Sequence, residues 1–164
     1  MTTDFKPIEV IGGDFSCGMM IVADHAMRHM PDEYGRLGLP DHEFDRHIAY
    51  DIGVEGVVRH LADLTGAPAV MARFSRLLID PNRGEDDPTL VRQIYDGAVI
   101  PGNYPLYADE LHRRIETWFR PFRTAVEETA AAIEGRTGAA AMMLSIHSFT
   151  PRMGNRSRPW HIGL

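Results

Sequence analysis

The sequence predicts an α/β domain, a three-layer sandwich in which helices cover both faces of a mostly parallel central sheet. Two observations carry this prediction. Apolar runs of strand length alternate along the chain with segments of helical periodicity. The runs are continuous rather than alternating, as is typical of strands buried on both faces. One α/β domain over residues 1–164 accounts for the whole length.

Two of the apolar runs end in a histidine. Residues 19–23 lead into Asp24 and His25, and residues 141–146 lead into His147. Ligands of open α/β sheets bind outside the carboxyl ends of the strands. We therefore expect the two histidines to lie together as a metal-binding or catalytic pair. The alternative is that each is a hydrogen-bonded structural residue at the end of its strand.

Four further stretches have the composition of strands. Residues 8–11 are short and precede a glycine turn, and residues 68–74 predict the second strand of the central sheet. Residues 77–79 form another short apolar run that ends in polar groups. Residues 160–164 have the pattern of the start of a strand.

Two long helices and one short helix are predicted between these strands. Apolar spacing indicates a helix over residues 41–65, closed by Gly66 as its C-cap. A second pattern runs over residues 107–134, where Pro121 should cause a kink. Residues 89–96 are expected to form the short helix, and the proline-rich segment that follows should be a covering loop.

Composition limits the possible partners. The formal net charge is −6, which argues against nucleic acid because such partners require a basic surface. The single cysteine, Cys17, excludes an internal disulfide and is interpreted as a small buried apolar residue. No stretch approaches the roughly 18 apolar residues of a membrane span, and the N-terminus lacks the features of a signal peptide. We expect a cytoplasmic protein with neither a nucleic-acid nor a membrane partner.

A third metal ligand would have to come from outside the two histidine-bearing strands. A catalytic zinc site takes three protein ligands of histidine or carboxylate type and keeps one position open. Asp45 is the first choice, because the N-terminus of the helix predicted over residues 41–65 should abut the strand tip that carries His25. Glu43 is the second choice. His47 and Asp51 are further candidates, and the alternative for them is a surface pair one helical turn apart.

The Asp-Pro-Asn-Arg sequence at positions 80–83 offers a different chemistry. A guanidinium binds a carboxylate through two parallel hydrogen bonds, and a neighbouring amide can hold a further lone pair. Asn82 and Arg83 are therefore candidates for a clamp on a substrate carboxylate. The alternative is an ordinary surface turn, since turn residues have the same composition.

The order of these motifs resembles the N-formylglutamate amidohydrolase family. The likeness is carried by Asp24-His25, residues 43–51, residues 75–83, Tyr104-Pro105 and residues 145–148. The resemblance implies a zinc-exopeptidase-like fold of the phosphorylase/hydrolase type. It also implies hydrolysis of a small-molecule N-acyl amino acid such as N-formylglutamate, with zinc or another divalent metal as cofactor.

The same resemblance implies roles for particular residues. His25 and His147 would be metal ligands with Asp45 as the acidic ligand, and Asn82 and Arg83 would grip the substrate carboxylate. In the resulting hypothesis, Ser148 or Arg152 orients the substrate or stabilises the oxyanion. Glu43 is the candidate general base.

Two departures from the family pattern leave other functions open. The usual His-Ser-Gly is replaced by His25-Ala26-Met27. The family also keeps a general-base glutamate on a late strand, and the sequence ends at Leu164 before such a strand. Three explanations are open: the chain is a fragment without the C-terminal strands, another acid is the general base, or catalysis is lost. The rival functions are a non-catalytic carboxylate-binding module and a peptidoglycan amidase.

Overall fold

The central sheet of the computed structural model has four strands, in the order β1-β3-β2-β6. The structure describes residues 5–153 and 156–164. The strands are β1 (Ile8–Ile11), β2 (Met19–Ala23), β3 (Ala69–Ala72) and β6 (Met142–Ser145). β2 runs parallel to β3 and to β6, whereas β1 is antiparallel to β3. The predicted α/β class with a mostly parallel sheet is confirmed.

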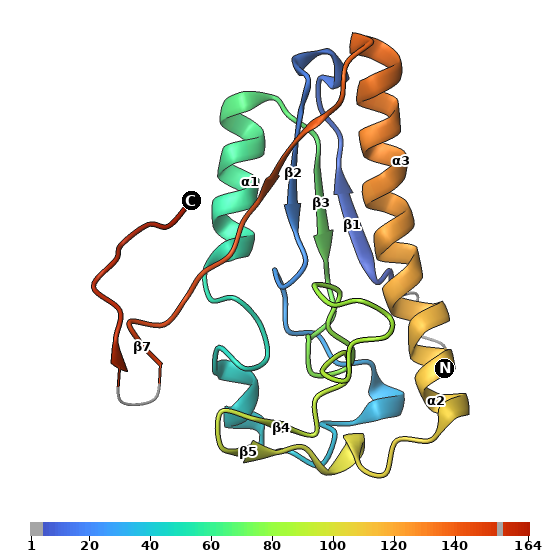
Figure 1. Cartoon of the computed structure of the whole chain (residues 1–164), viewed down its shortest axis with the longest axis vertical. Helices are drawn as coiled ribbons and strands as arrows, with labels where there is room; N and C mark the ends of the chain where they lie inside the picture. The colour runs from blue at the N-terminus through green and yellow to red at the C-terminus, as the bar shows by residue number, and fades with distance from the viewer. Residues whose placement is uncertain (1–4, 154–155) are drawn as a thin grey trace.

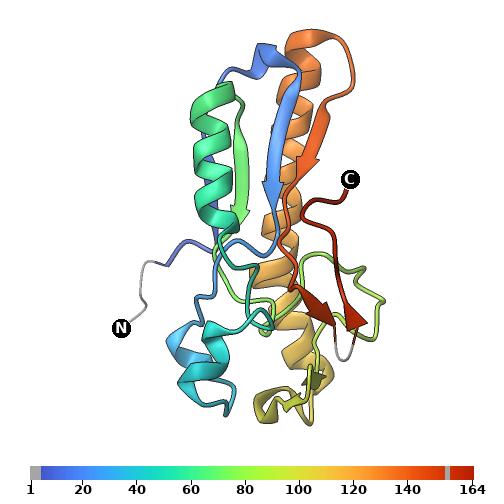
Figure 2. The same cartoon turned by 90° about the vertical axis from the view of Figure 1, so that its left-hand side faces the viewer.

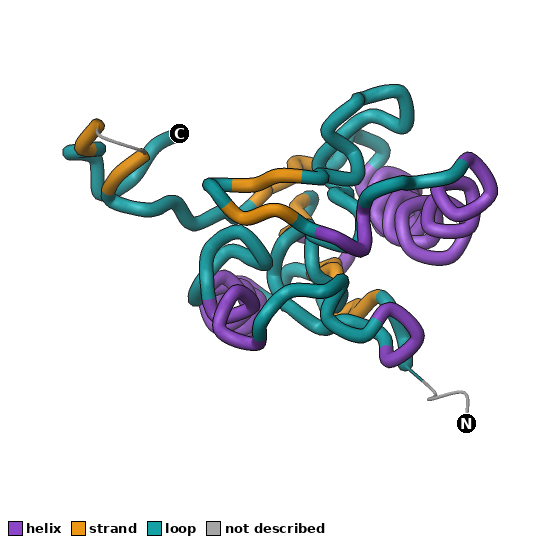
Figure 3. Tube along the Cα trace, turned by 90° about the horizontal axis from the view of Figure 1, so that it is seen from below, coloured by secondary structure: helices purple, strands orange, loops and turns teal. Residues whose placement is uncertain are grey.

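Two helices cover the opposite faces of this sheet, α1 (Val54–Thr65) on one side and α3 (Arg120–Thr137) on the other (Figures 1 and 2). Figure 3 shows, from below, the strands with the two helices on opposite sides of them. Successive side chains of a strand point to opposite faces. Accordingly, Met20 packs in the cluster that contains residues of α3, and Ile21 packs in the cluster that contains residues of α1. No helix of the described residues is long and apolar enough to cross a membrane.

The helix predicted over residues 41–65 is only half correct. Its first part is a 3-10 helix, Asp41–Asp45, and the regular helix α1 begins only at Val54. Gly53 precedes α1 with a φ of 83°, a left-handed conformation that glycine adopts without cost. Tertiary bonding also competes with the helix here, because the backbone N–H of Asp51 donates to the carbonyl of His25 at 2.8 Å.

The second long helical pattern is present, with a wider turn before its proline. α2 (Ala108–Arg114) leads into a π-helical turn, Ile115–Phe119, and then into α3. Pro121 lies in the first turn of α3, and the N–H of Arg120 bonds five residues back to Ile115. The π turn accommodates Pro121, which has no N–H to donate, at the point where the sequence predicted a kink.

Three smaller predictions are wrong. The expected helix over residues 89–96 is absent, and a hairpin of β4 (Ile94–Tyr95) and β5 (Ala98–Val99) forms instead. Positive φ angles at both residues of its Asp96-Gly97 turn favour this hairpin over a helix. Residues 160–164 form no strand. Cys17 is exposed rather than buried, because Phe15 is the residue of its short 3-10 helix that packs against the core.

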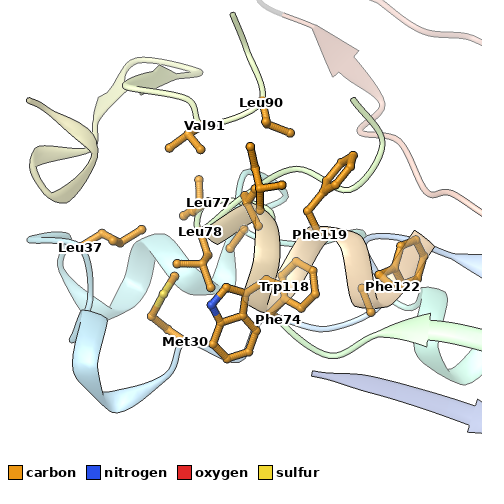
Figure 4. Close-up of a cluster of buried hydrophobic side chains, with 14 of the residues drawn as sticks. Met30, Leu37, Phe74, Leu77, Leu78, Leu90, Val91, Trp118, Phe119 and Phe122 are labelled. Atoms are coloured by element: carbon orange, nitrogen blue, oxygen red, sulfur yellow. The ribbon is translucent and has the colours of Figure 1, made fainter. Parts of the chain in front are cut away.

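The apolar run at residues 77–79 is buried but is not a strand. The N–H of Leu78 donates to the carbonyl of Ser75 in a turn, and the run packs with Phe74 and Trp118 in the larger core cluster (Figure 4). The side chain of Asn103 donates to the carbonyl of Leu77 at 2.9 Å. These bonds replace strand pairing for the backbone of the run and hold in place the loop that leads to Asp80.

Candidate metal and substrate site

The two histidines predicted to converge do lie side by side. β2 and β6 are parallel neighbours, with Val22 opposite Ser145, so their carboxyl ends meet at the same edge of the sheet. The ring centroids of His25 and His147 are 5.5 Å apart. The site is therefore a product of strand register, because each ring lies only two or three residues beyond this pair.

Asp24 completes a group that could hold a metal ion. Among the described residues, one ligand atom each from Asp24, His25 and His147 lie within 4.8 Å of one another. Oδ1 of Asp24 is 3.7 Å from Nδ1 of His25 and 3.5 Å from Nε2 of His147. Within the part of the chain described, Oδ1 of Asp24 and Nδ1 of His25 are buried and have no hydrogen-bond partner. Buried polar atoms without partners are costly, and a cation between them would satisfy both. The donor set fits a divalent ion such as zinc.

Two further carboxylates form hydrogen bonds with the histidine rings. Oδ1 of Asp80 is 2.6 Å from Nε2 of His25, and Oδ2 of Asp51 is 2.9 Å from Nδ1 of His147. Asp51 also pairs through its other oxygen with the buried side chain of Arg76. Each imidazole is thus oriented by a carboxylate, the arrangement that histidine ligands of metals usually show.

The charges of this cluster shift its titration. Burial disfavours the charged form of His25, but the neighbouring carboxylates of Asp51 and Asp80 outweigh burial and raise its pKa. The hydrogen bond to Asp51 raises the pKa of His147 against the opposing effect of burial. Burial alone would raise the pKa of Asp51, but its bond to His147 and the adjacent cations hold that pKa far below its usual range. The pKa of Asp80 is likewise lowered, because the contact with His25 outweighs burial.

The structure does not bring Asp45 or Glu43 to the two histidines. The carboxylate of Asp45 is exposed and pairs with Arg28, and the carboxylate of Glu43 pairs with Arg46. Both acids lie in the 3-10 helix rather than at the N-terminus of α1, which is why the sequence argument misplaced them. Asp24 lies in the position expected for Asp45.

Asp24 is the acid that the sequence analysis missed, and Asp51 is a candidate that it did not choose. Asp51 was offered as a third ligand with a surface pair as the alternative, and the structure shows it buried beside His147. Its position two residues before Gly53, the true N-cap of α1, is a signal that could have placed it at the strand tips. The direct adjacency of Asp24 to His25 was the corresponding signal for Asp24.

The residues predicted to bind substrate line two separate pockets. Asn82 and Arg83 line a pocket of about 620 Å³ against α3. Ser148 and Arg152 line a second pocket, of about 900 Å³, together with Asp51. The second pocket reaches the cluster through Asp51, which bonds to His147. The first pocket reaches it through Asp80, whose Oδ2 lies 3.7 Å from Nε of Arg83.

Comparisons with known proteins identify the family of the chain. The family model described as N-formylglutamate amidohydrolase matches residues 17–163. A crystal structure of a gene product from Agrobacterium tumefaciens is 31% identical with a TM-score of 0.87, over 96% of this chain and 62% of that one. The crystal structure of N-formylglutamate amidohydrolase from Ralstonia eutropha is 23% identical with a TM-score of 0.64, over 87% of this chain and 57% of that one. The chain thus spans less than two thirds of either protein. No curated protein matches it.

Proposed function

This chain belongs to the N-formylglutamate amidohydrolase family, and we propose that it is a metal-dependent hydrolase of the N-acyl amide of an acidic amino acid such as N-formylglutamate. One observation carries the proposal. Asp24, His25 and His147 offer three ligand atoms within 4.8 Å of one another, and two of these atoms are buried without partners. A group of this kind is costly unless an ion satisfies it.

We assign Asp24, His25 and His147 as the ligands of a zinc ion or another divalent metal. Such an ion would act as a Lewis acid toward the amide carbonyl and lower the pKa of a water molecule to about 7. The chain supplies the orientation of the ligands. Asp80 fixes the ring of His25, and Asp51 fixes the ring of His147.

Asp51 is better suited to an electrostatic role than to proton transfer. A general base works best when its pKa lies near the operating pH. The pKa of Asp51 is held far below that range by its bond to His147 and by adjacent cations. Its negative charge would instead stabilise positive charge on His147 and keep Arg76 at the wall of the larger pocket.

The substrate proposed here carries two carboxylates, and the chain offers cationic or amide groups for both. Arg83 and Asn82 are assigned to one carboxylate, by their match to the carboxylate-binding pair of the family. Arg152 is assigned to the other, with Ser148 as a hydrogen-bond partner, because both line the pocket that contains Asp51. Bidentate recognition by arginine suits planar carboxylates.

A second function, binding without catalysis, is favoured because neither candidate acid is suited to act as the general base. Glu43, the candidate general base, pairs with Arg46, and Asp51 has too low a pKa for the role. A module that binds acyl amino acids without cleaving them would need no base. Calorimetry with N-formylglutamate separates the two functions, because binding without formate release supports the module.

The experiment that tests the hydrolase loads the purified chain with zinc and measures metal content and formate release from N-formylglutamate. We expect about one zinc per chain and turnover. Asp24→Asn should lose both, whereas Asp45→Asn should retain both, since the Asp45 carboxylate is exposed and pairs with Arg28. Equal zinc content in wild type and Asp24→Asn would refute the ligand assignment, and wild type that holds zinc but releases no formate would refute the activity.

A further inference from the structure

We infer that the larger pocket holds an aromatic acyl group, so that the substrate class of this chain is the N-aroyl acidic amino acids, such as N-benzoylglutamate. The inference rests on the proposed function, because the same kind of amide bond is cleaved at the same site. It goes beyond that function because it assigns the acyl group from the walls of the pocket. Three observations carry it: the volume of the pocket, its apolar side chains near the histidines, and the fixed ring of Tyr95.

The larger pocket has much more space than a formyl group needs. Its volume is about 900 Å³, near the upper end of the range of about 300–1,000 Å³ that is typical of pockets for drug-sized ligands. A formyl group adds only a single carbon and a single oxygen to the amino acid that carries it. A pocket of this volume can hold the carboxylate assigned to Arg152 together with an acyl group that contains a ring.

Apolar side chains line this pocket close to the reacting centre. Ile52 directly follows Asp51, and Phe149 lies two residues after His147. Ile52 and Phe149 are 52% and 44% exposed. Single exposed apolar side chains are normal, but apolar side chains gathered in one pocket mark a binding surface. The amino-acid part of the substrate carries carboxylates, which suit arginines, so the uncharged acyl group is the part that suits this wall.

Tyr95 of β4 gives the same pocket an aromatic wall of fixed orientation. The guanidinium of Arg92 lies 4.5 Å from the centroid of its ring, and the ring of His47 packs edge-on with the centroids 6.4 Å apart. Arg76 donates to its hydroxyl at 3.3 Å. A ring that is already held on several sides loses little entropy when a ligand packs against it. Aromatic rings stack favourably on one another, so this wall suits an aroyl group better than a small aliphatic one.

The cations of the pocket fit the same substrate class. Arg152 and Arg158 both line it, and the guanidinium of Arg158 lies 5.8 Å from the centroid of the Phe149 ring. An aromatic side chain and a guanidinium are thus neighbours, and N-benzoylglutamate presents a ring and carboxylates to match them. Its hydrolysis breaks the acyl C–N bond. The oxygen of water bonds to the acyl carbon to give benzoate, and both protons of that water end on the nitrogen, which leaves as the ammonium group of glutamate.

The test compares N-benzoylglutamate with N-formylglutamate on the full chain. Phe149→Ala and Ile52→Ala each remove part of the apolar wall. Trp160→Ala and Val57→Ala are matched controls, because each removes an exposed apolar side chain that lines neither of the two pockets. The first readout is the Kd of each compound for the metal-free chain, measured by calorimetry. The second is kcat/KM of the zinc-loaded chain, measured by release of glutamate.

We expect wild type to bind N-benzoylglutamate at least about 10-fold more tightly than N-formylglutamate, because one extra apolar group in a pocket is worth about that much. Phe149→Ala and Ile52→Ala should each reduce this preference by about 3- to 10-fold, and the two controls should keep it within about twofold. In the zinc-loaded chain, the same two wall variants should lower kcat/KM more for the benzoyl than for the formyl compound. Rates are compared between variants because conjugation with the ring makes the benzoyl carbonyl intrinsically less reactive.

Three results would overturn the inference: equal or tighter binding of N-formylglutamate by wild type, no measurable binding of N-benzoylglutamate by the metal-free or the zinc-loaded chain, or a preference that neither wall variant changes. Failure of the proposed function has a different signature, because the zinc-loaded wild type would then release glutamate from neither compound. In that event the calorimetric preference still tests the pocket, since it is measured on metal-free protein.

Discussion

Asp51 and His147 are 96 positions apart in the sequence, yet Oδ2 of Asp51 accepts a hydrogen bond from Nδ1 of His147 at 2.9 Å. Oδ1 of the same carboxylate pairs with Arg76, and both members of that pair are more than nine-tenths buried. One side chain therefore joins the end of β6, the loop after β3 and the turn before α1. The geometry of the site and the stability of the fold depend on the same contacts.

Removal of Arg76 should destabilise the fold strongly. Arg76→Ala leaves the buried carboxylate of Asp51 without its cation, and loss of one partner of a buried pair costs about 3–5 kcal/mol. Arg28→Ala is the matched control, because the Arg28–Asp45 pair is exposed, with side-chain exposures of 46% and 69%. That variant should lose about 0–1 kcal/mol. Urea unfolding measures both, and equal losses would show that burial of the Arg76 pair carries no special weight.

Zinc should stabilise the chain against heat. A ligand that binds only the folded state at a hundredfold excess over its Kd adds about 2.7 kcal/mol, which corresponds to a rise in Tm of about 5–10 °C for a chain of this size. EDTA should reverse the shift. His25→Ala should show none, because it removes a ligand atom of the proposed group. A shift of the same size in His25→Ala would place the stabilising zinc elsewhere on the chain.

Stability should fall in acid in part through Glu110. Burial opposes ionisation of this acid, but hydrogen bonds from Arg113 and Arg114 outweigh burial and lower its pKa. A lowered folded-state pKa gives stability that is present above the unfolded pKa, about 4.3 for glutamate, and is lost as the pH falls through the folded value. Glu110→Gln should therefore be less stable than wild type by about 1–2 kcal/mol at neutral pH.

The pH dependence of stability in acid provides the check on this prediction. The difference in unfolding free energy between wild type and Glu110→Gln should shrink as the pH drops below about 4 and vanish once Glu110 is protonated in both states. Urea denaturation at a series of pH values measures it. A gap that stays constant from neutral to acid pH would mean that Glu110 acts through its shape rather than its charge.

The sequence was informative where a single local rule decides the structure. Continuous apolar runs identified β2, β3 and β6, and parallel topology then brought His25 and His147 to one edge. Strand periodicity and the position of the carboxyl ends are enough for that inference.

Which acids belong to the site depends on long-range contacts, and local signals alone did not decide between the candidates. Asp45 was chosen from the assumption that one helix begins at position 41, but the N–H of Asp51 bonds to the carbonyl of His25 and helix α1 starts only at Val54. Asp80 was placed correctly at the end of an apolar run, although that run is a buried turn. The local signals for Asp24 and Asp51, adjacency to His25 and a position shortly before Gly53, do not show whether a carboxylate contacts a histidine ring or faces solvent.

The register of β6 against β2 has a consequence for insertions and deletions. Val22 lies opposite Ser145, three positions before His25 and two before His147. Because side chains alternate between faces every residue, a one-residue slip of β6 would leave its backbone ladder intact and turn the His147 imidazole away from its partner. A two-residue slip would restore the face but move the ring by about 6.6 Å along the strand, so the two imidazoles meet at one length of β6 only.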